Sequence, residues 1–144
     1  MEGEKSVVVV DACVIVKWFV DEEYSRAARL LRDSYVNGLI EIAVPALMLY
    51  EVLNALKYSG AYGEDELKEI AEILEDYQFE TYGLSGDLAK KTVEIAMRKG
   101  LTIYDASYVA LAEKLNTVLY TADEEMIRKI HDERLVRHIS HYRP

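Results

Sequence analysis

The sequence has a single cysteine, Cys13, among its 144 residues, so no disulfide can form within the chain. Disulfides stabilise many small extracellular domains, and a chain without an internal disulfide is typical of a protein from a reducing cytoplasm. The one long apolar stretch, near the start, is interrupted by Asp11 and Lys17 and is too broken to span a bilayer. The segment before it, MEGEK, is not a basic leader. We therefore expect a cytoplasmic protein without a membrane partner.

Proline and glycine are also scarce, at two and seven residues, and the chain has no repeat, linker or low-complexity segment. Hydrophobic residues make up 51% and charged residues 30%, as in ordinary globular proteins. A chain of this length is about one domain long and can bury a real core. We expect a single domain over residues 1–144.

Positive charge is in the minority, and the formal net charge is −9. That sum argues against a nucleic-acid partner, because phosphate binding depends on Lys and Arg. The charge is unevenly distributed, however. Residues 64–80 hold eight acids and one Lys, whereas residues 128–144 hold five Lys or Arg and two acids. The acidic segment is most simply a solvated helix face, yet the distribution leaves room for RNA at one end of the molecule and a basic protein at another.

Short apolar segments alternate with helical patterns along the chain. Residues 6–10, SVVVV, and residues 117–120, TVLY, are typical of strands buried on both faces of a parallel sheet. Further strands are expected at 39–44, 78–82 and 135–139, and helices at 12–19, 22–38, 46–60, 64–76, 87–99, 105–115 and 124–130. Pro45 suits the first turn of the helix that follows the second strand. The alternation predicts an α/β fold, a three-layer sandwich in which helices flank a central, mainly parallel sheet.

Two acids directly follow the predicted buried strands. Asp11 comes after residues 6–10, and Asp123 closely follows residues 117–120. In open parallel sheets, ligands bind in the crevice beyond the carboxyl ends of the strands. Each acid is explained equally well as the N-cap of the helix that follows it. For both residues, a cap and a site residue look identical from sequence.

Two further acids lie within predicted helices. Glu51 is placed mid-helix, and the residues one turn away from it are all uncharged, so its face is largely apolar. An ionised Glu against a core is costly unless it is paired or coordinated, although it can also lie at a face boundary and reach solvent. Asp105 has a structural explanation, because Thr102 and Asp105 match a capping box with Asp in place of the usual Glu.

The four acids together indicate a metal site. Two stand at the carboxyl ends of buried strands, and the other two are on helices able to reach the same edge of the sheet. Several carboxylates without neighbouring His or Cys suit Mg²⁺ or Mn²⁺ rather than Zn²⁺. The three His fall between residues 131 and 141 without a zinc-site spacing, and we interpret them as surface residues. We expect a site formed by Asp11, Glu51, Asp105 and Asp123.

Three blocks of sequence carry a family resemblance. They are VVVDACVIVKWF (8–19), VPALMLYEVLNAL (44–56) and GLTIYDASYVALAEKLNTVLYTAD (100–123). With these motifs the chain resembles the PIN-domain ribonucleases, in particular the VapC-type toxins of toxin–antitoxin pairs. The resemblance implies a PIN-like fold and a Mg²⁺- or Mn²⁺-dependent endoribonuclease whose catalytic and metal-binding residues are the four acids. It also implies that Thr121 and Asn54 support the site. Cys13 departs from the family, in which a Ser or Thr more often follows the first Asp by two residues.

The resemblance implies partners as well: an RNA substrate, an antitoxin protein and a second copy of the chain in a homodimer. Basic residues that are candidates to hold RNA phosphates are Lys17, Lys90, Lys91, Arg98 and Lys99. A dehalogenase-like phosphatase needs a second Asp where Cys13 stands, and a receiver domain needs adjacent acids after the first strand. Two alternatives stay open: a catalytically inactive PIN-like protein-binding module, and a free-standing RNA-processing nuclease without an antitoxin.

Overall fold

The computed structural model describes residues 5–144. The strands within this range are β1 (Ser6–Val10), β2 (Ile40–Pro45), β3 (Glu80–Tyr82), β4 (Leu119–Thr121) and β5 (Val136–His138). The helices are α1 (Ala12–Phe19), α2 (Ser25–Val36), α3 (Met48–Ser59), α4 (Glu64–Asp76), α5 (Gly86–Lys99), α6 (Ile103–Lys114) and α7 (Glu124–Ile130), followed by a short 3₁₀ helix, η1 (Ile139–His141). Each predicted element is present, with boundaries shifted by a few residues.

The five strands form one sheet in the order β3-β2-β1-β4-β5, and every neighbouring pair is parallel. Val10 of β1 pairs with Tyr120 of β4, so the residues that follow them lie side by side at the carboxyl edge. From β1 the chain moves outward to β2 and β3, and it then returns to the other side of β1 to add β4 and β5. This reversal places the topological switch point between β1 and β4.

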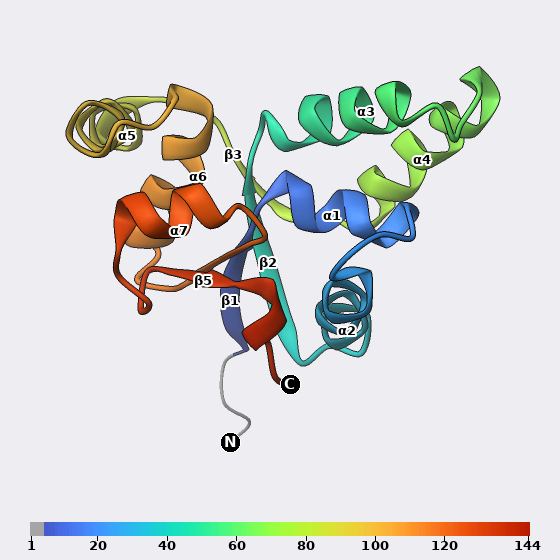
Figure 1. Ribbon diagram of the computed structural model, residues 1–144, viewed down its shortest axis with the longest axis horizontal. Coiled ribbons are helices and arrows are strands. Elements are labelled where there is room, and N and C mark those ends of the chain that lie inside the picture. The colour runs from blue at the N-terminus through green and yellow to red at the C-terminus, as the bar shows by residue number, and fades with distance from the viewer. Residues whose placement is uncertain (1–4) are drawn as a thin grey trace.

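Helices cover both faces of the sheet. Helices α1 to α4 lie on one face and α5 to α7 on the other, as Figure 1 shows with the sheet between them. Crossovers between parallel strands are right-handed, so strands added on one side of β1 place their connecting helices on one face of the sheet. Strands added on the other side of β1 place theirs on the opposite face. The predicted three-layer α/β sandwich is confirmed, and its sheet is wholly parallel among these strands.

One local prediction is wrong. Pro45 is the last residue of β2, paired with Tyr82 of β3, and does not lie in the first turn of α3. Proline has no backbone N–H, so at the last residue of β2 it removes a single donor from the ladder, and the Ala46 N–H that follows donates to the Tyr82 carbonyl at 2.8 Å. Helix α3 therefore begins only at Met48, and Glu51 lies in its first turn rather than mid-helix.

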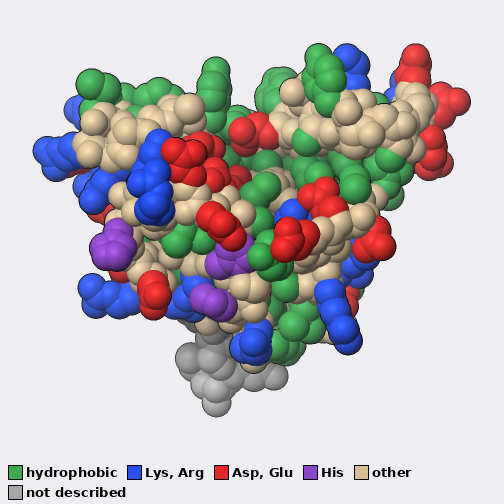
Figure 2. Space-filling view, viewed as in Figure 1, with side chains coloured by type: hydrophobic (Ala, Val, Ile, Leu, Met, Phe, Trp, Pro, Cys, Tyr) green, Lys and Arg blue, Asp and Glu red, His purple; other side chains and the backbone are tan. Residues whose placement is uncertain are grey.

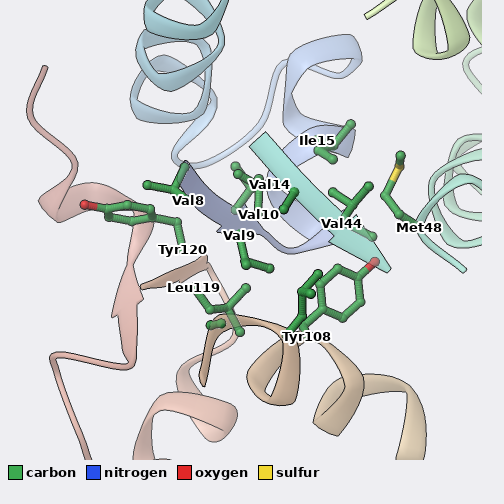
Figure 3. Close-up of a cluster of buried hydrophobic side chains, with 14 of the residues drawn as sticks. Val8, Val9, Val10, Val14, Ile15, Val44, Met48, Tyr108, Leu119 and Tyr120 are labelled. Atoms are coloured by element: carbon green, nitrogen blue, oxygen red, sulfur yellow. The ribbon is translucent and has the colours of Figure 1, made fainter. Parts of the chain in front are cut away.

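The core is built around β1 and α6. Val9, Val10 and Leu119 are completely buried, and Figure 3 shows them packed with Tyr108 of α6. Every residue of α6 from Ala106 to Ala112 is buried, because α6 lies against the sheet on one side and α5 on the other. No helix within residues 5–144 is long and apolar enough to cross a membrane.

Candidate active site

The site lies at the carboxyl edge of the sheet, at the switch point between β1 and β4. The backbone N–H of Asp11 donates to the carbonyl of Tyr120 at 3.0 Å, which continues the ladder one residue beyond β1. Asp11 thus lies beside Thr121, the last residue of β4. Asp123 follows two residues later. The parallel register therefore brings the first and last of the four predicted acids to adjacent strand ends.

Asp11 precedes α1 at the N-cap position, but its side chain makes no capping hydrogen bond. Its Oδ2 atom instead accepts hydrogen bonds from the Thr121 hydroxyl at 2.7 Å and from the Cys13 thiol at 3.3 Å. The residue is only 7% exposed and forms no ion pair among those of residues 5–144. The capping explanation of this carboxylate is therefore wrong.

Asp123 does act as a cap. Its Oδ1 accepts a hydrogen bond from the Met126 N–H at 3.1 Å at the start of α7. Its own N–H donates to the Thr121 hydroxyl oxygen at 3.0 Å. Thr121 is thus bonded to both acids, donating to Asp11 and accepting from Asp123. The cap holds one carboxylate oxygen of Asp123 and leaves the second without a protein hydrogen bond in the described part of the chain.

Glu51 is half-buried on α3 and accepts a 2.8 Å hydrogen bond at Oε1 from the Tyr108 hydroxyl. No Lys or Arg within residues 5–144 forms an ion pair with it, in agreement with the uncharged face expected from sequence. Glu51 is therefore a carboxylate turned toward the interior of the site and paired with a neutral donor.

Asp105 lies in the first turn of α6. Its backbone N–H donates to the Thr102 hydroxyl oxygen at 3.0 Å, so Thr102 caps the helix as expected. The reciprocal bond of a capping box, from the Thr102 N–H to the Asp105 carboxylate, is not formed in the described structure. The capping explanation accounts for the backbone of Asp105 but leaves its carboxylate available.

The four carboxylates are close enough to influence one another. Burial is the main cause that raises the pKa of Asp11, and the negative charges of Asp105 and Asp123 raise it further, against the lowering effect of Thr121 and Cys13. The pKa of Glu51 is raised by burial, then by Asp11 and Asp105. The pKa of Asp105 is raised by burial, then by Asp123. The charges of Asp105 and Asp123 therefore act on Asp11, that of Asp123 acts on Asp105, and those of Asp11 and Asp105 act on Glu51.

The surface shows the same concentration of charge. In Figure 2, acidic side chains gather in the hollow between the part of the molecule built by α5 and α6 and the part built by α3 and α4. Each of the four acids also stands at the beginning of a helix, namely α1, α3, α6 or α7. The positive ends of these helix dipoles offset part of the repulsion between the carboxylates.

The donor set fits a hard divalent cation. Asp11 is a buried carboxylate without a cationic partner, and buried carboxylates require pairing or coordination. Oxygen ligands of this kind are those preferred by Mg²⁺ and Mn²⁺. Within residues 5–144, no group of three or more His, Cys, Asp or Glu side chains is arranged so that it could hold a metal ion. The fit to a divalent cation therefore rests on the chemistry of the carboxylates and on the unpaired charge of Asp11, not on a preformed ligand geometry.

The expected supporting residues occupy different surroundings. Thr121 is fully buried within the acid cluster. Asn54 is exposed and lines a groove of about 720 Å³ between α3 and α4.

Among the basic candidates, Lys17 pairs with Glu22 at 2.8 Å, and Lys91 and Arg98 pair with acids of α5 and α6. Lys90 and Lys99 are exposed and form no ion pair within residues 5–144.

Two residues of the site were not among the sequence predictions. Tyr108 donates to Glu51, and Lys129 lowers the pKa of Asp105 while donating to the Gly100 carbonyl at 2.9 Å. Tyr108 follows Asp105 by three residues, a spacing that places both on one side of a helix. That spacing is the signal by which Tyr108 can be found.

Comparison with known proteins places the chain in a family. The sequence model of the PIN domain matches residues 8–131. The chain is a PIN domain. This membership confirms the resemblance inferred from the sequence motifs.

Two curated relatives of this PIN domain come from Pyrobaculum aerophilum. Ribonuclease VapC3 is 35% identical over 128 residues, which cover 84% of this chain and 92% of the relative. Exonuclease VapC9 is 28% identical over 114 residues, which cover 79% of this chain and 86% of the relative. A toxin–antitoxin complex from Klebsiella pneumoniae contains a chain of similar fold, with a TM-score of 0.63 at 18% identity, covering 83% of this PIN domain and 89% of that chain.

Proposed function

We propose that this PIN domain is a Mg²⁺- or Mn²⁺-dependent endoribonuclease and the toxin of a toxin–antitoxin pair. The observation that carries the proposal is the environment of the Asp11 carboxylate. It is buried, it accepts a hydrogen bond from Thr121, and the charged side chains that act on it are the acids Asp105 and Asp123. A structural carboxylate in such a place destabilises the fold unless a ligand compensates for its charge. The name of the relative ribonuclease VapC3, from a protein aligned over most of this chain, supports RNA as the substrate.

In the proposed site, Asp11 and Asp105 would hold the cation directly, and Glu51 and Asp123 would complete its shell directly or through water. The bound cation would lower the pKa of its water and stabilise charge on the oxygen that departs from phosphorus. Thr121 fixes Oδ2 of Asp11 and thereby orients the other oxygen of the same carboxylate. Asn54 is proposed to support the site from α3.

Net hydrolysis of the phosphodiester adds water across one P–O bond, so that the hydroxyl remains on phosphorus and the proton passes to the leaving oxygen. The acids of this chain carry negative charge and repel an RNA phosphate unless cations intervene. Lys90 and Lys99, which are exposed, and Lys129, which lowers the pKa of Asp105 and also pairs with Glu125 at 3.3 Å, are the basic side chains that we propose to offset this repulsion.

The mode of cleavage is testable because the two curated relatives carry different names, one a ribonuclease and one an exonuclease. We expect internal cleavage. A covalently closed circular RNA incubated with the protein and Mn²⁺ should be linearised, since an endonuclease needs no end. An RNA that is degraded only when linear would instead assign the chain to exonucleases.

An antitoxin partner is proposed on two grounds. The acidic cluster attracts Arg or Lys side chains, and such a side chain competes with cation and phosphate together. The similar fold found in a toxin–antitoxin complex points the same way. We propose that the pair acts in the cytoplasm. The test is to mix the protein with the product of each neighbouring gene and measure RNA cleavage. If none of them inhibits, the free-standing RNA-processing nuclease becomes the better account.

A homodimer is proposed from the apolar surface. Large hydrophobic side chains are exposed on several helices, and Tyr50 of α3 and Met97 of α5 are each 80% exposed. Surfaces of this kind often mark contacts between proteins, and tyrosine is enriched there. Light scattering at micromolar concentration should give twice the mass of 16.5 kDa calculated for the chain. A clean monomer contradicts the dimer but not the nuclease.

A further inference from the structure

The hydrogen bond between Tyr108 and Glu51 joins two helices across the site. The Tyr108 hydroxyl on α6 lies 2.8 Å from Oε1 of Glu51 on α3, and the two residues are 57 positions apart in the chain. This is the one hydrogen bond that the Glu51 side chain makes within residues 5–144. Its second oxygen, Oε2, has no protein partner in that range. One oxygen of Glu51 is therefore held in place while the other stays available.

Packing fixes the position of this donor. Tyr108 is completely buried, and Figure 3 shows its ring within the cluster formed by β1, β2 and β4. A ring packed on all sides has little freedom to rotate away, so its hydroxyl presents a donor at a defined point. An exposed tyrosine would exchange this bond with water.

The same division between a fixed and an available oxygen recurs in two other acids. The Thr121 hydroxyl holds Oδ2 of Asp11, and the Met126 N–H holds Oδ1 of Asp123. The Glu51 side chain caps no helix and bonds to no residue of its own helix. The Tyr108 hydroxyl from α6 is the group that holds its Oε1 atom. Because Asp105 lies one turn before Tyr108, α6 carries one acid of the site and the group that holds a second.

We propose that Tyr108 is the positioning residue for Glu51, fixing Oε1 so that Oε2 faces the divalent cation. The proposal rests on the metal-binding role of Glu51 in the proposed function. Tyr108 does not touch the cation or the RNA and acts only through Glu51. Partners of this kind, which hydrogen-bond to a ligand, typically contribute 10–100-fold to metal affinity or activity.

The test is Tyr108→Phe, which removes one oxygen and keeps the packed ring. Binding of Mn²⁺ is measured on the protein itself, by the loss of the free-ion signal in electron paramagnetic resonance. The dissociation constant should rise by roughly 10-fold or more. The matched control is Tyr120→Phe, another buried tyrosine, whose hydroxyl lies 3.3 Å from Arg137 rather than beside an acid. That variant should bind Mn²⁺ as the parent does.

A double-mutant cycle separates positioning from packing. If Tyr108 acts through Glu51, then Tyr108→Phe should weaken Mn²⁺ binding in the parent but change it less than 2-fold in a Glu51→Gln background. An equal loss in both backgrounds overturns the proposal, as does unchanged affinity in the single variant. Unfolding of Tyr108→Phe without metal also overturns it, because the hydroxyl then supports the fold. A parent protein that neither binds Mn²⁺ nor cleaves RNA would defeat the proposed function instead.

Discussion

The Thr121 hydroxyl donates a 2.7 Å hydrogen bond to Oδ2 of Asp11, joining residues 110 positions apart in the chain. The bond exists because β1 and β4 are neighbours in the sheet, with Val10 and Tyr120 in register just before it. Both side chains are buried. The central pair of the site is therefore a direct product of the strand order.

Replacing Thr121 with Val should weaken metal binding while nearly preserving side-chain shape. The variant leaves Oδ2 of Asp11 with only the Cys13 thiol as a donor. We expect Mn²⁺ affinity to fall roughly 10–100-fold and the metal-free protein to lose about 1–3 kcal/mol of stability. Thr121→Ser keeps the hydroxyl and is the control, expected to bind Mn²⁺ close to the parent. Equal affinity for parent and Val variant would show that the bond has no part in metal binding.

Cys13 should resist alkylation in the folded protein. Burial raises the pKa of its thiol, and the charge of Asp11 raises it further, so the reactive thiolate is scarce at neutral pH. Mass spectrometry after treatment with iodoacetamide at pH 7 should find the native protein unmodified and the urea-unfolded protein fully modified. Rapid modification of the native protein would mean that the Asp11 side of the cluster is open to solvent.

The metal-free protein should be destabilised by its own site as pH rises. The folded pKa of Asp11 is raised above its unfolded value, so ionisation disfavours the fold. This cost is absent below the unfolded pKa and complete above the folded pKa. Asp11→Asn cannot ionise, so in EDTA it should melt a few degrees above the parent at pH 8 and close to it at pH 4. A variant that melts lower than the parent at pH 8 would contradict the assigned shift.

Part of the site followed from sequence and part did not. The alternation of apolar strands with helices was sufficient to predict a parallel α/β sandwich, because period and burial are local properties of the chain. Whether Asp11 and Asp123 were caps or site residues was undecidable, since both roles require an acid before a helix. In the structure, the Asp123 side chain caps α7 by accepting from the Met126 N–H with one oxygen, whereas the Asp11 side chain caps no helix and accepts from Thr121 on another strand.

Tyr108 escaped prediction for a different reason. From Ala106 to Ala112 the helix that carries it is buried on all sides, so burial does not single out the residue that reaches the site, and only the spacing of three residues from Asp105 points to it. Its partner, Glu51, is on another helix, and their contact depends on how α3 and α6 are placed around the sheet. The start of α3 was also misplaced, because proline is common in the first turn of a helix and Pro45 instead ends β2. Such features depend on tertiary packing rather than on local pattern.

The most direct test of the account is RNA cleavage by the parent, Asp11→Asn and Asp105→Asn proteins, each with Mn²⁺ and with EDTA. Circular dichroism on the same samples establishes that all three are folded, which is expected because the Asp11 side chain caps no helix. The account predicts cleavage by the parent that EDTA abolishes, and a loss of roughly 100-fold or more in both variants. Cleavage by folded Asp11→Asn and Asp105→Asn at the parental rate would contradict the assignment of these carboxylates to the metal site.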